Sequence, residues 1–376
     1  MKAEQVRDVE QGTRVEEIVS DIRGKILRGD LTPGEQLPIR LELSEQYGAS
    51  SRTLQEAVDH LMEQGFLRAN RRHGTFVAPH PPHISRYGLV FPFSRSRSNR
   101  SRHWLALKKV AEEIEDPPEF EIHRYFGMEK PSDAEDYQTL ISDIEQHRLA
   151  GLIFSSPPYA LSGTPVLEWK GLPRVEVASK PQRPHVSCVK YDNETFLRKV
   201  LGYFKERGCA RLGIFDLIKE GDALTPRMQA ICQAAPEYGL RVKDPWVVGG
   251  AVGASHFTKN TIRLLMHLPA ENRPDALLIG DDNLAKDVTE AIAASPVKVP
   301  EDLDIVCHAN FPCPPPTAVP AHKVGYRMDE VIDVAIRHIN ALRRGDEDVR
   351  TIEILAKTEG EVENAVREYH PVPSSG

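Results

Sequence analysis

Residues 35–77 decide the fold, and they read EQLPIRLELSEQYG, then ASSRTLQEAVDHLMEQG, then FLRANRRHGTFV. The first segment predicts a short helix that begins near Pro38 and ends at Gly48, and the second an amphipathic helix that ends at Gly65. The third segment predicts a β-hairpin with a basic tip. This order of elements is typical of a winged helix-turn-helix, which places its second helix in the major groove of DNA.

The second helix of this stretch has two distinct faces. Ser50 is a good N-cap, because its hydroxyl can accept a free backbone N–H. Leu54 and Leu61 belong to an apolar stripe, whereas Arg52 and Gln55 lie on the opposite face, where they can reach guanine and adenine edges. A solvated face on an ordinary helical hairpin is the alternative interpretation, and the adjoining basic hairpin favours DNA. The residues that we expect to contact DNA are Arg40, Ser50, Ser51, Arg52, Thr53, Gln55, Arg71, Arg72, His73 and Gly74.

Composition sets limits on the rest of the chain. The 376 residues are 40% hydrophobic and 27% charged, as expected of a globular protein with two or three domains. No apolar run approaches the ~18 residues of a membrane span, and residues 1–10 lack the apolar core of a signal peptide, so we expect a cytoplasmic protein without membrane contact. The net charge of −7 argues mildly against nucleic-acid binding. DNA affinity, however, needs only a local basic face, such as the one at the hairpin tip.

The sequence carries weak signals for catalysis and for metal binding. The five cysteines are widely spaced and form no CxxC pair, so neither a disulfide framework nor a zinc site is indicated. Residues 249–253 lack the lysine of a phosphate-binding loop, and neither HExxH nor GxSxG occurs. His80 and His83 could bind a metal, but two ligands are poor evidence. We therefore expect no catalytic residues, no metal and no cofactor.

Domain boundaries follow from changes in composition and in the spacing of apolar residues along the chain. We expect a frayed segment at 1–12, the winged helix at 13–78, a stiff, extended spacer with three prolines at 79–85, and an α/β region at 86–370. In that region apolar strands alternate with amphipathic helices, which predicts two parallel sheets covered on both faces. The nine expected strands are 87–93, 120–125, 151–155, 174–178, 186–191, 211–216, 246–249, 276–280 and 303–307. The expected helices are 104–115, 134–147, 194–207, 226–238, 255–268, 285–294 and 329–343.

Residues 13–79 resemble the GntR family of bacterial regulators. The resemblance rests on Gly29–Gly34 with Leu37-Pro38, on Glu42-Leu43-Ser44, on Thr53-Leu54 with Glu56-Ala57, and on Glu63–Gly65 followed by Gly74–Val77. It implies a DNA-binding winged helix. The chain departs from the family at positions that matter for operator sequence: Ser51 stands where the family aims an arginine at bases, Arg52 follows one place later, and Gln55 replaces a second arginine.

Residues 86–366 resemble the ligand-binding domain of LacI-type repressors, which is itself similar to periplasmic sugar-binding proteins. The matching pieces are residues 189–193, 209–215, Arg227 with 235–240, 274–282 and 299–306. The combination of the two domains looks like the arabinose-repressor class of regulator. The resemblance implies a two-lobed fold that binds a small effector between its lobes.

The same resemblance implies which residues contact the effector. Asp192 and Arg227 occupy positions that bond sugar hydroxyls in relatives, and Asp281 stands where relatives often have asparagine. The family's last sugar-binding aspartate is Ala309 here, so either Asn310 substitutes for it or the effector is not an ordinary pentose or hexose. Asp192 precedes a predicted helix and can equally be its N-cap, and Arg227 can equally form a surface salt bridge. The full expected set is Phe93, Trp104, Asp192, Arg227, Asp281 and Asn310.

Two further features near the first α/β strand have alternative interpretations. Trp104 can stack on a sugar ring or begin the apolar stripe of its helix. The basic run 95–102 can bind an anionic effector or form a solvated loop.

The predicted function is therefore a ligand-responsive transcription regulator, most simply a repressor. It would bind double-stranded operator DNA as a homodimer and respond to a carbohydrate-like small molecule. Two alternatives remain at this point: a DNA-binding regulator whose sensor no longer binds a ligand, and an α/β enzyme with a DNA tether.

Overall fold

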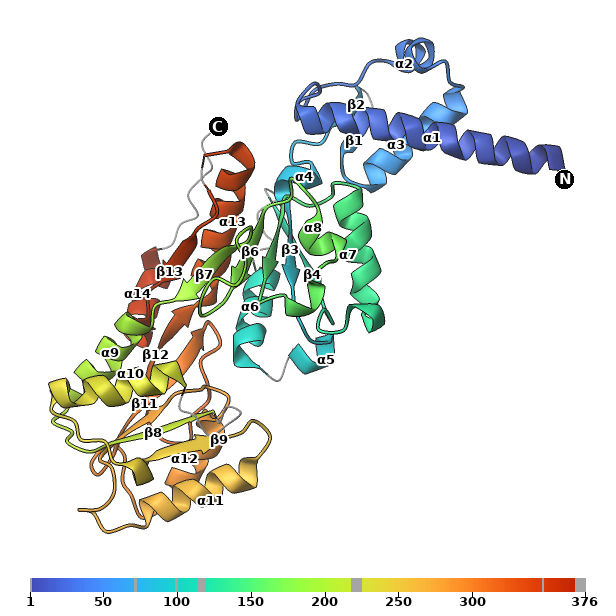
Figure 1. The fold of residues 1–376 in the computed structure, drawn as a ribbon. Helices are drawn as coiled ribbons and strands as arrows, with labels where there is room; N and C mark the ends of the chain where they lie inside the picture. The colour runs from blue at the N-terminus through green and yellow to red at the C-terminus, as the bar shows by residue number, and fades with distance from the viewer. Residues whose placement is uncertain are drawn as a thin grey trace.

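The computed structural model describes residues 2–70, 73–98, 101–113, 120–217, 225–346 and 348–368. The chain forms three parts, which Figure 1 shows as a blue N-terminal head, a middle lobe and a far lobe. We call residues 2–78 the head, the body built on the sheet β13-β7-β6-β5-β3-β4 lobe 1, and the body built on the sheet β14-β12-β11-β10-β8-β9 lobe 2. Each sheet has six strands, and together the two lobes form the sensor.

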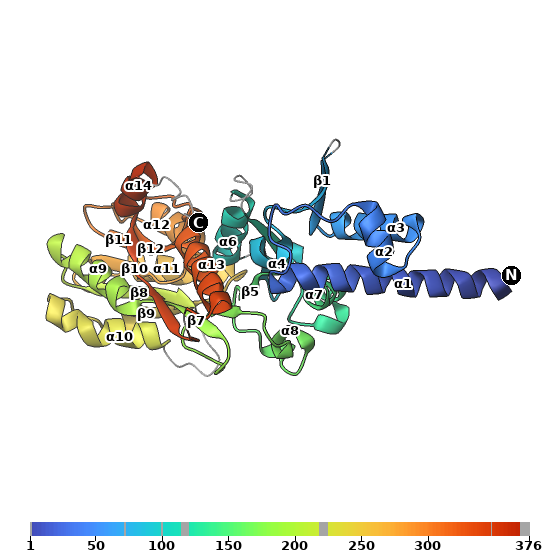
Figure 2. The ribbon, with the colours of Figure 1, turned by 90° about the horizontal axis from the view of Figure 1, so that it is seen from above.

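The head is a winged helix-turn-helix. Its elements are α1 (Lys2–Arg28), α2 (Arg40–Tyr47), α3 (Ser51–Glu63), β1 (Leu67–Asn70) and β2 (Gly74–Val77). Gly48 ends α2 in the left-handed conformation at φ 59°, which a side chain would disfavour and which makes the tight turn into α3 possible. The strands pair antiparallel, with Leu67 opposite Val77, and Figure 2 shows this hairpin projecting from the head. The apolar faces of all three helices and the hairpin meet in one core, which contains Ile18, Ile22, Leu54, Leu61 and Phe66.

Two parts of the N-terminal region differ from expectation. The first helix begins at Lys2, although we expected residues 2–12 to be frayed because the apolar periodicity starts only at Val15. Residues 79–85 are not an extended spacer, because Pro82–Ser85 form the short helix α4. Pro82 occupies its first turn, where a missing N–H costs nothing, and Ser85 is buried. The ring of His83 stacks on Phe66 at 5.8 Å, so this segment contacts the head core directly.

Lobe 1 is a parallel sheet between helices. The strands are β3 (Arg86–Val90), β4 (Glu121–Tyr125), β5 (Gly151–Phe154), β6 (Arg174–Val177), β7 (Ser187–Tyr191) and β13 (Thr351–Ile354). The helical segments are α5 (Arg95–Ser98), α6 (Arg102–Glu113), η1 (Pro131–Asp133), α7 (Glu135–Glu145), η2 (Tyr159–Leu161), α8 (Pro165–Glu168) and α13 (Met328–Arg344). Strands β5 and β6 are buried along their whole length, as expected of strands covered on both faces.

Lobe 2 repeats this plan. Its strands are β8 (Leu212–Leu217), β9 (Val247–Gly250), β10 (Ala276–Ile279), β11 (Asp304–Phe311), β12 (His322–Arg327) and β14 (Lys357–Thr358), of which only β14 is antiparallel to its neighbour. The helical segments are α9 (Asn193–Glu206), α10 (Pro226–Ala234), η3 (Ala235–Tyr238), η4 (Asp244–Trp246), α11 (Ser255–Met266), α12 (Ala285–Ala293) and α14 (Glu359–Glu368).

The chain crosses between the lobes three times, from β7 to α9, from β12 to α13 and from β13 to β14. All nine α/β strands expected from the sequence are present. Strands β12, β13 and β14 were missed: β12 follows a proline-rich stretch, β13 is largely exposed, and β14 has two residues. These three strands complete the sheets beside the crossings, so the two-lobed fold depends on them.

No described helix is long and apolar enough to cross a membrane.

Candidate functional site

The N-terminus of α3 is built around Ser50. Its Oγ accepts a hydrogen bond from the backbone N–H of Thr53 at 3.2 Å, which confirms the predicted cap. The Thr53 hydroxyl lies 2.9 Å from the same Oγ, and Thr53 is only 7% exposed. Of the two residues, Ser50 is exposed while Thr53 is held inside the turn, so the structure does not place the Thr53 side chain on the outer face with Ser51 and Arg52.

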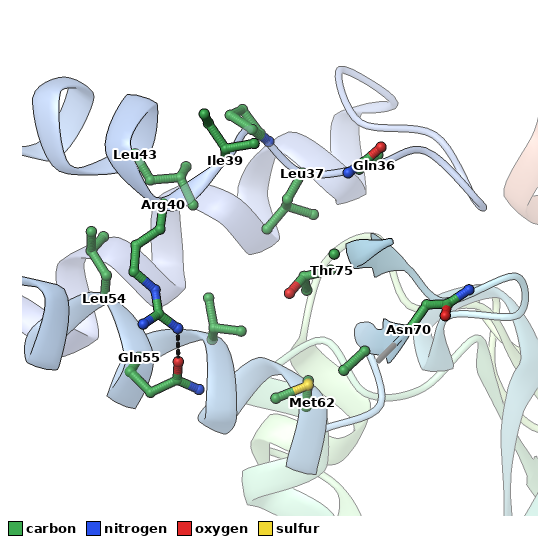
Figure 3. A pocket seen from close by; sticks show the side chains of 14 residues that line it. Gln36, Leu37, Ile39, Arg40, Leu43, Leu54, Gln55, Met62, Asn70 and Thr75 are labelled. Atoms are coloured by element: carbon green, nitrogen blue, oxygen red, sulfur yellow. Dashed lines mark hydrogen bonds between the residues drawn. The ribbon is translucent and has the colours of Figure 1, made fainter. Parts of the chain in front are cut away.

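The outer face of α3 carries the other polar residues. Ser51 is exposed, and Arg52 lies along the helix with its Nε 3.0 Å from Oε1 of Glu56. Gln55 accepts a hydrogen bond from Arg40 of α2 and donates to Asp59 at 2.7 Å. Figure 3 shows Arg40 reaching across from α2 to Gln55. The structure therefore joins two residues that the sequence predicted separately, and Arg40 supplies a positive charge beside Gln55.

A groove separates α3 from the hairpin, and its volume is about 400 Å³. Apolar side chains of Leu54 and Met62 form part of its floor, and Arg40 and Gln55 lie at its edge (Figure 3). Beside it, Gln36 donates to the carbonyl of His73 at 2.7 Å and so fixes the hairpin to the segment before α2.

Gly74 begins β2 at φ +110°, a conformation that L side chains rarely adopt. A Cβ there would come within 2.8 Å of Nε2 of Gln36, but this is the flexible end of that side chain, so the backbone conformation is what favours glycine. His73 and Gly74 are exposed at the hairpin. The predicted contacts Arg71 and Arg72 lie outside the described residues.

Asp192 caps a helix at the crossing from lobe 1 to lobe 2. Its two carboxylate oxygens accept hydrogen bonds from the backbone N–H groups of Glu194 (3.1 Å) and Thr195 (3.0 Å), and the Thr195 hydroxyl also donates to it. Burial raises the pKa of Asp192, but these hydrogen bonds outweigh burial and the net pKa is lowered. Of the two roles considered for Asp192, the cap is the one that the geometry displays.

Arg227 lies at the carboxyl end of β8. It donates to the carbonyl of Gly280, and its Nη2 is 3.3 Å from Oδ2 of Asp216, which is 3% exposed. The guanidinium also lies over the ring of Phe196, 5.5 Å from its centroid. Arg227 is therefore at the strand ends that face the other lobe, as expected, but it is already bound by lobe 2.

Asp281 and Asn310 also lie at this edge, at the ends of β10 and β11. Oδ1 of Asp281 accepts two hydrogen bonds from Asn283, at 2.9 and 2.8 Å. Asn310 is 4% exposed and donates to Oδ2 of Asp282 at 2.8 Å. Burial, followed by the charge of Asp281, raises the pKa of Asp282 to about 7.

We call the interlobe cluster the polar residues that meet at this edge: His103, Arg227, Asp281, Asp282, Asn283 and Asn310. Sequence reasoning gave no role to His103, Asp282 or Asn283. His103 of α6 lies 3.2 Å from both the carbonyl of Ser155 and the hydroxyl of Tyr191. The backbone N–H of Arg102 donates to Asn283 at 2.9 Å, and this bond joins lobe 1 to lobe 2. A polar residue within a few positions of the end of a buried strand, such as Asp282 after β10, was the available signal for this cluster.

Phe93 and Trp104 belong to a different surface. Their rings meet edge to face at 4.7 Å and line a cavity of about 330 Å³ in lobe 1. The other walls include Phe154 and Tyr159. The structure thus brings these two predicted residues together on lobe 1, whereas Arg227 and Asp281 are on lobe 2.

The basic run at 95–102 falls partly outside the described residues. Arg95 stacks over Phe126 at 4.6 Å and pairs with Asp136 at 3.1 Å, while Nη1 of Arg102 donates to the carbonyls of Cys313 and Pro314, each at 3.3 Å. Within the described ranges, no group of three His, Cys, Asp or Glu side chains is arranged to hold a metal ion.

Comparison with known families agrees with this geometry. Residues 14–77 match the model of bacterial regulatory proteins of the gntR family, and residues 201–354 match the periplasmic binding protein-like domain. The arabinose metabolism transcriptional repressor of Geobacillus stearothermophilus is 22% identical over 311 residues, which cover 78% of this chain and 81% of that protein. The repressor MngR of the mannosyl-D-glycerate transport/metabolism system of Escherichia coli is 38% identical over 61 residues, which cover 16% of this chain and a quarter (25%) of that protein.

Solved structures share the fold of the sensor. A LacI family regulator from Lactobacillus casei with bound glucose superimposes with a TM-score of 0.52 at 17% identity, covering 73% of this chain and 98% of that one. The regulator CelR in complex with cellobiose gives a TM-score of 0.54 at 18% identity over 83% of this chain and 91% of that one. With both segments matched and both folds present, this chain is a transcription regulator that joins a DNA-binding domain of the bacterial gntR family to a periplasmic-binding-protein-like sensor.

Proposed function

We propose that this protein is an effector-controlled repressor that binds operator DNA through α3 and the hairpin and releases it when a small molecule occupies the sensor. The observation that carries the proposal is the exposed face of α3, where Arg52 and the Arg40–Gln55 pair face solvent on a helix whose other face is fully packed. A preformed helix of this kind can enter a major groove without reorganising its core. This activity is proposed for the cytoplasm, where DNA is accessible, and requires no catalysis.

The proposed effector binds between the lobes, at the carboxyl ends of the strands of both sheets. Arg227, Asp281 and Asn310 lie there, and the matched relatives include proteins named for arabinose or solved with glucose and cellobiose. We infer a carbohydrate-like effector whose hydroxyl groups would replace hydrogen bonds that the residues of the interlobe cluster now make with one another. Exchange of this kind shifts the balance between two lobe arrangements.

Helix α13 offers a physical route from the lobes to the head. It begins at Met328, directly at a crossing between the lobes, and runs along lobe 1 (Figure 1). Near its end, Arg343 donates to the carbonyl of His83 at 3.1 Å, and the His83 ring stacks on Phe66 in the head core. A shift of α13 would therefore move α4 and, with it, the head. A coupling of about 1–3 kcal/mol is enough to change DNA occupancy strongly.

We further propose that the protein acts as a homodimer, so that two heads contact two halves of a near-palindromic operator. Lobe 2 supports this with apolar side chains that face solvent on and beside α11: Phe257 is 55% exposed, Leu264 76% and Val252 53%. Light scattering of the purified protein tests the oligomeric state directly. Leu264→Glu is expected to shift the dimer toward monomer, and a monomeric wild-type protein would contradict the proposal.

DNA recognition is tested with Arg52→Ala. This variant is expected to weaken binding to the protein's own promoter fragment about tenfold or more, and binding to random DNA much less, in a titration at fixed salt. An equal loss on both fragments would make Arg52 a phosphate contact. The control is Arg337→Ala, because Arg337 is an exposed arginine of the sensor helix α13 and forms the same kind of pair, with Asp333 one helical turn away.

Effector binding is tested with Arg227→Ala and a panel of sugars and sugar phosphates. A ligand raises the melting temperature of the wild type by mass action, and the variant is expected to lose that shift while it retains DNA binding. If no compound stabilises the wild type and none releases DNA, the chain is a regulator without effector control.

A further inference from the structure

The cavity beside Phe93 and Trp104 has a composition unlike that of a sugar site. Its volume is about 330 Å³, and most of its lining is apolar: Val90, Phe93, Met128, Phe154 and Leu161 among others. A free sugar carries a hydroxyl on nearly every carbon, and each hydroxyl buried against such a wall would lose its hydrogen bonds to water without replacement. An aromatic ring, in contrast, gains from the same wall through apolar contact and edge-to-face packing.

One hydrogen-bond donor in the cavity region is unused. Nε1 of Trp104, a residue that lines the cavity, is buried and has no partner among the described residues. A buried N–H without an acceptor is unfavourable, so a turn of the indole that brings Nε1 from its buried position to an acceptor atom on a bound molecule would be favoured. The remaining polar groups of the lining are few and include Ser156 and Glu129.

The cavity adjoins the interlobe cluster through two pairs of consecutive residues. His103 belongs to the polar cluster and Trp104 to the cavity, and likewise the carbonyl of Ser155 bonds His103 while Ser156 lines the cavity. A molecule placed here would therefore have a polar end beside His103 and an apolar end in the cavity. Across the cluster, Asp192 is used as a helix cap and Arg227 is held by Asp216, so fewer groups remain to bind hydroxyls.

We propose that the effector is a hydroxylated molecule that carries an aromatic ring, with the ring in this cavity and an acceptor atom near the ring bonded to Nε1 of Trp104. This inference rests on the proposed effector control and specifies the chemical class of the effector. Tyr159, which is 63% exposed and lies 5.6 Å from the Arg183 guanidinium, forms an outer wall of the cavity that a ring can contact.

The test uses three matched probes on the full-length protein: D-glucose, phenyl β-D-glucopyranoside and phenol. Binding is followed by calorimetry and by the melting temperature. The phenyl glucoside and phenol are expected to bind and glucose to bind at least about tenfold more weakly than the phenyl glucoside. Equal affinity for glucose and its phenyl glucoside, or no binding of either ring-bearing probe, would overturn the inference.

Two variants test whether the aromatic ring of the bound molecule lies in the cavity. Tyr159→Ala removes an exposed side chain and is expected to fold normally while it weakens phenyl glucoside binding about tenfold. Trp104→Phe keeps an aromatic wall but removes the donor, and it is expected to weaken both ring-bearing probes, because each carries an oxygen attached to the ring. The control is Tyr238→Ala in lobe 2, where the tyrosine has a similar cation contact, to Lys205 at 5.9 Å, but lies far from the cavity. Unchanged affinity in both Tyr159→Ala and Trp104→Phe would refute the assignment.

DNA titrations separate this inference from the proposed function. If ring-bearing probes bind the wild type but leave its affinity for promoter DNA unchanged, the cavity assignment stands and effector control fails. If glucose alone binds and releases DNA, effector control stands and the aromatic class is wrong.

Discussion

The head and the sensor hold their polar side chains in different ways. On the head, Ser51 and Arg52 lie on the surface of a helix, and their contacts are local. In the sensor, Arg227 of α10 is bonded to Asp216 of β8, and Asn310, which is 4% exposed, is bonded to Asp282 in the loop after β10. The head thus presents a surface that can meet DNA as it stands, whereas an effector must replace bonds that the sensor already makes. The polar face of the head therefore needs no rearrangement before it meets DNA, whereas binding at the interlobe cluster would break existing hydrogen bonds and so favour a second arrangement of the lobes.

The substitution that should cost the most stability tests whether the head and the sensor unfold independently. Phe66 is fully buried in the head, and Phe66→Ala should lower the free energy of unfolding of the head by about 3–5 kcal/mol. We expect loss of DNA binding with retained ligand binding by the sensor, measured by urea denaturation and both titrations. The matched control is Phe215→Ala, equally buried in lobe 2. A single transition that shifts equally in both variants would show that head and sensor unfold as one unit.

The second prediction concerns how the stability of the sensor depends on pH. The pKa of Asp282 is raised to about 7 because its carboxyl is buried, so ionisation is harder in the folded than in the unfolded chain. The protonated Asp282 carboxyl therefore favours the folded state. This contribution to stability is fully present below about pH 4 and is lost as the pH rises through 7. Asp282→Asn should remove this dependence.

The amide oxygen introduced by this substitution can still accept the hydrogen bond from Asn310, so the variant tests charge and not shape. At pH 8 it should be more stable than the wild type, on the order of 3 kcal/mol, and at pH 4 nearly equal to it. Denaturation curves at both pH values measure this. Parallel pH profiles for the two proteins would contradict the assignment of the shift to Asp282.

A smaller effect tests the role of Asp192. Asp192→Ala removes the cap of α9 and should cost about 0.5–2 kcal/mol, whereas Asp192→Asn should restore most of that loss because asparagine also caps helices. If the cap is the whole role, the asparagine variant responds to effector like the wild type. Restored stability without effector response would reveal a ligand contact as well.

The smallest effect on stability is expected for Arg52→Ala. Its pair with Glu56 is exposed, with 81% of the arginine side chain accessible, so its loss should change the free energy of unfolding by less than about 0.5 kcal/mol. Thermal melts measure this, and a normal melt beside weakened DNA binding would confirm that the face is built for recognition. A large loss of stability would instead give Arg52 a structural role.

Sequence patterns predicted local features well. Ser50 as the cap of α3, Gly48 as the turn and the nine sensor strands all depend on neighbouring residues, because caps, turns and periodic burial are decided within a few residues. The resemblance to gntR-type and periplasmic-binding-type domains was likewise confirmed. Residues 79–85 were wrongly expected to be extended, because proline content does not reveal that Pro82 can begin a helix against the head.

The candidate sites were predicted less completely. For Asp192 the sequence allowed a cap or a ligand, and only the distances to Glu194 and Thr195 show the cap. The contact between Arg40 and Gln55 spans two helices, and the cluster around His103 spans two lobes. Such contacts require the positions of segments far apart in the chain, which periodicity cannot supply.

Residue patterns alone predicted the kind of protein, a winged helix followed by an α/β sensor, and the polar residues on the outer face of α3. Only the folded chain shows which polar groups already have hydrogen-bond partners, and only there do Phe93 and Trp104 line one cavity beside the interlobe cluster. The physical reason is that backbone preferences act between neighbours, whereas hydrogen bonding and burial in a site depend on the three crossings that bring distant strand ends together.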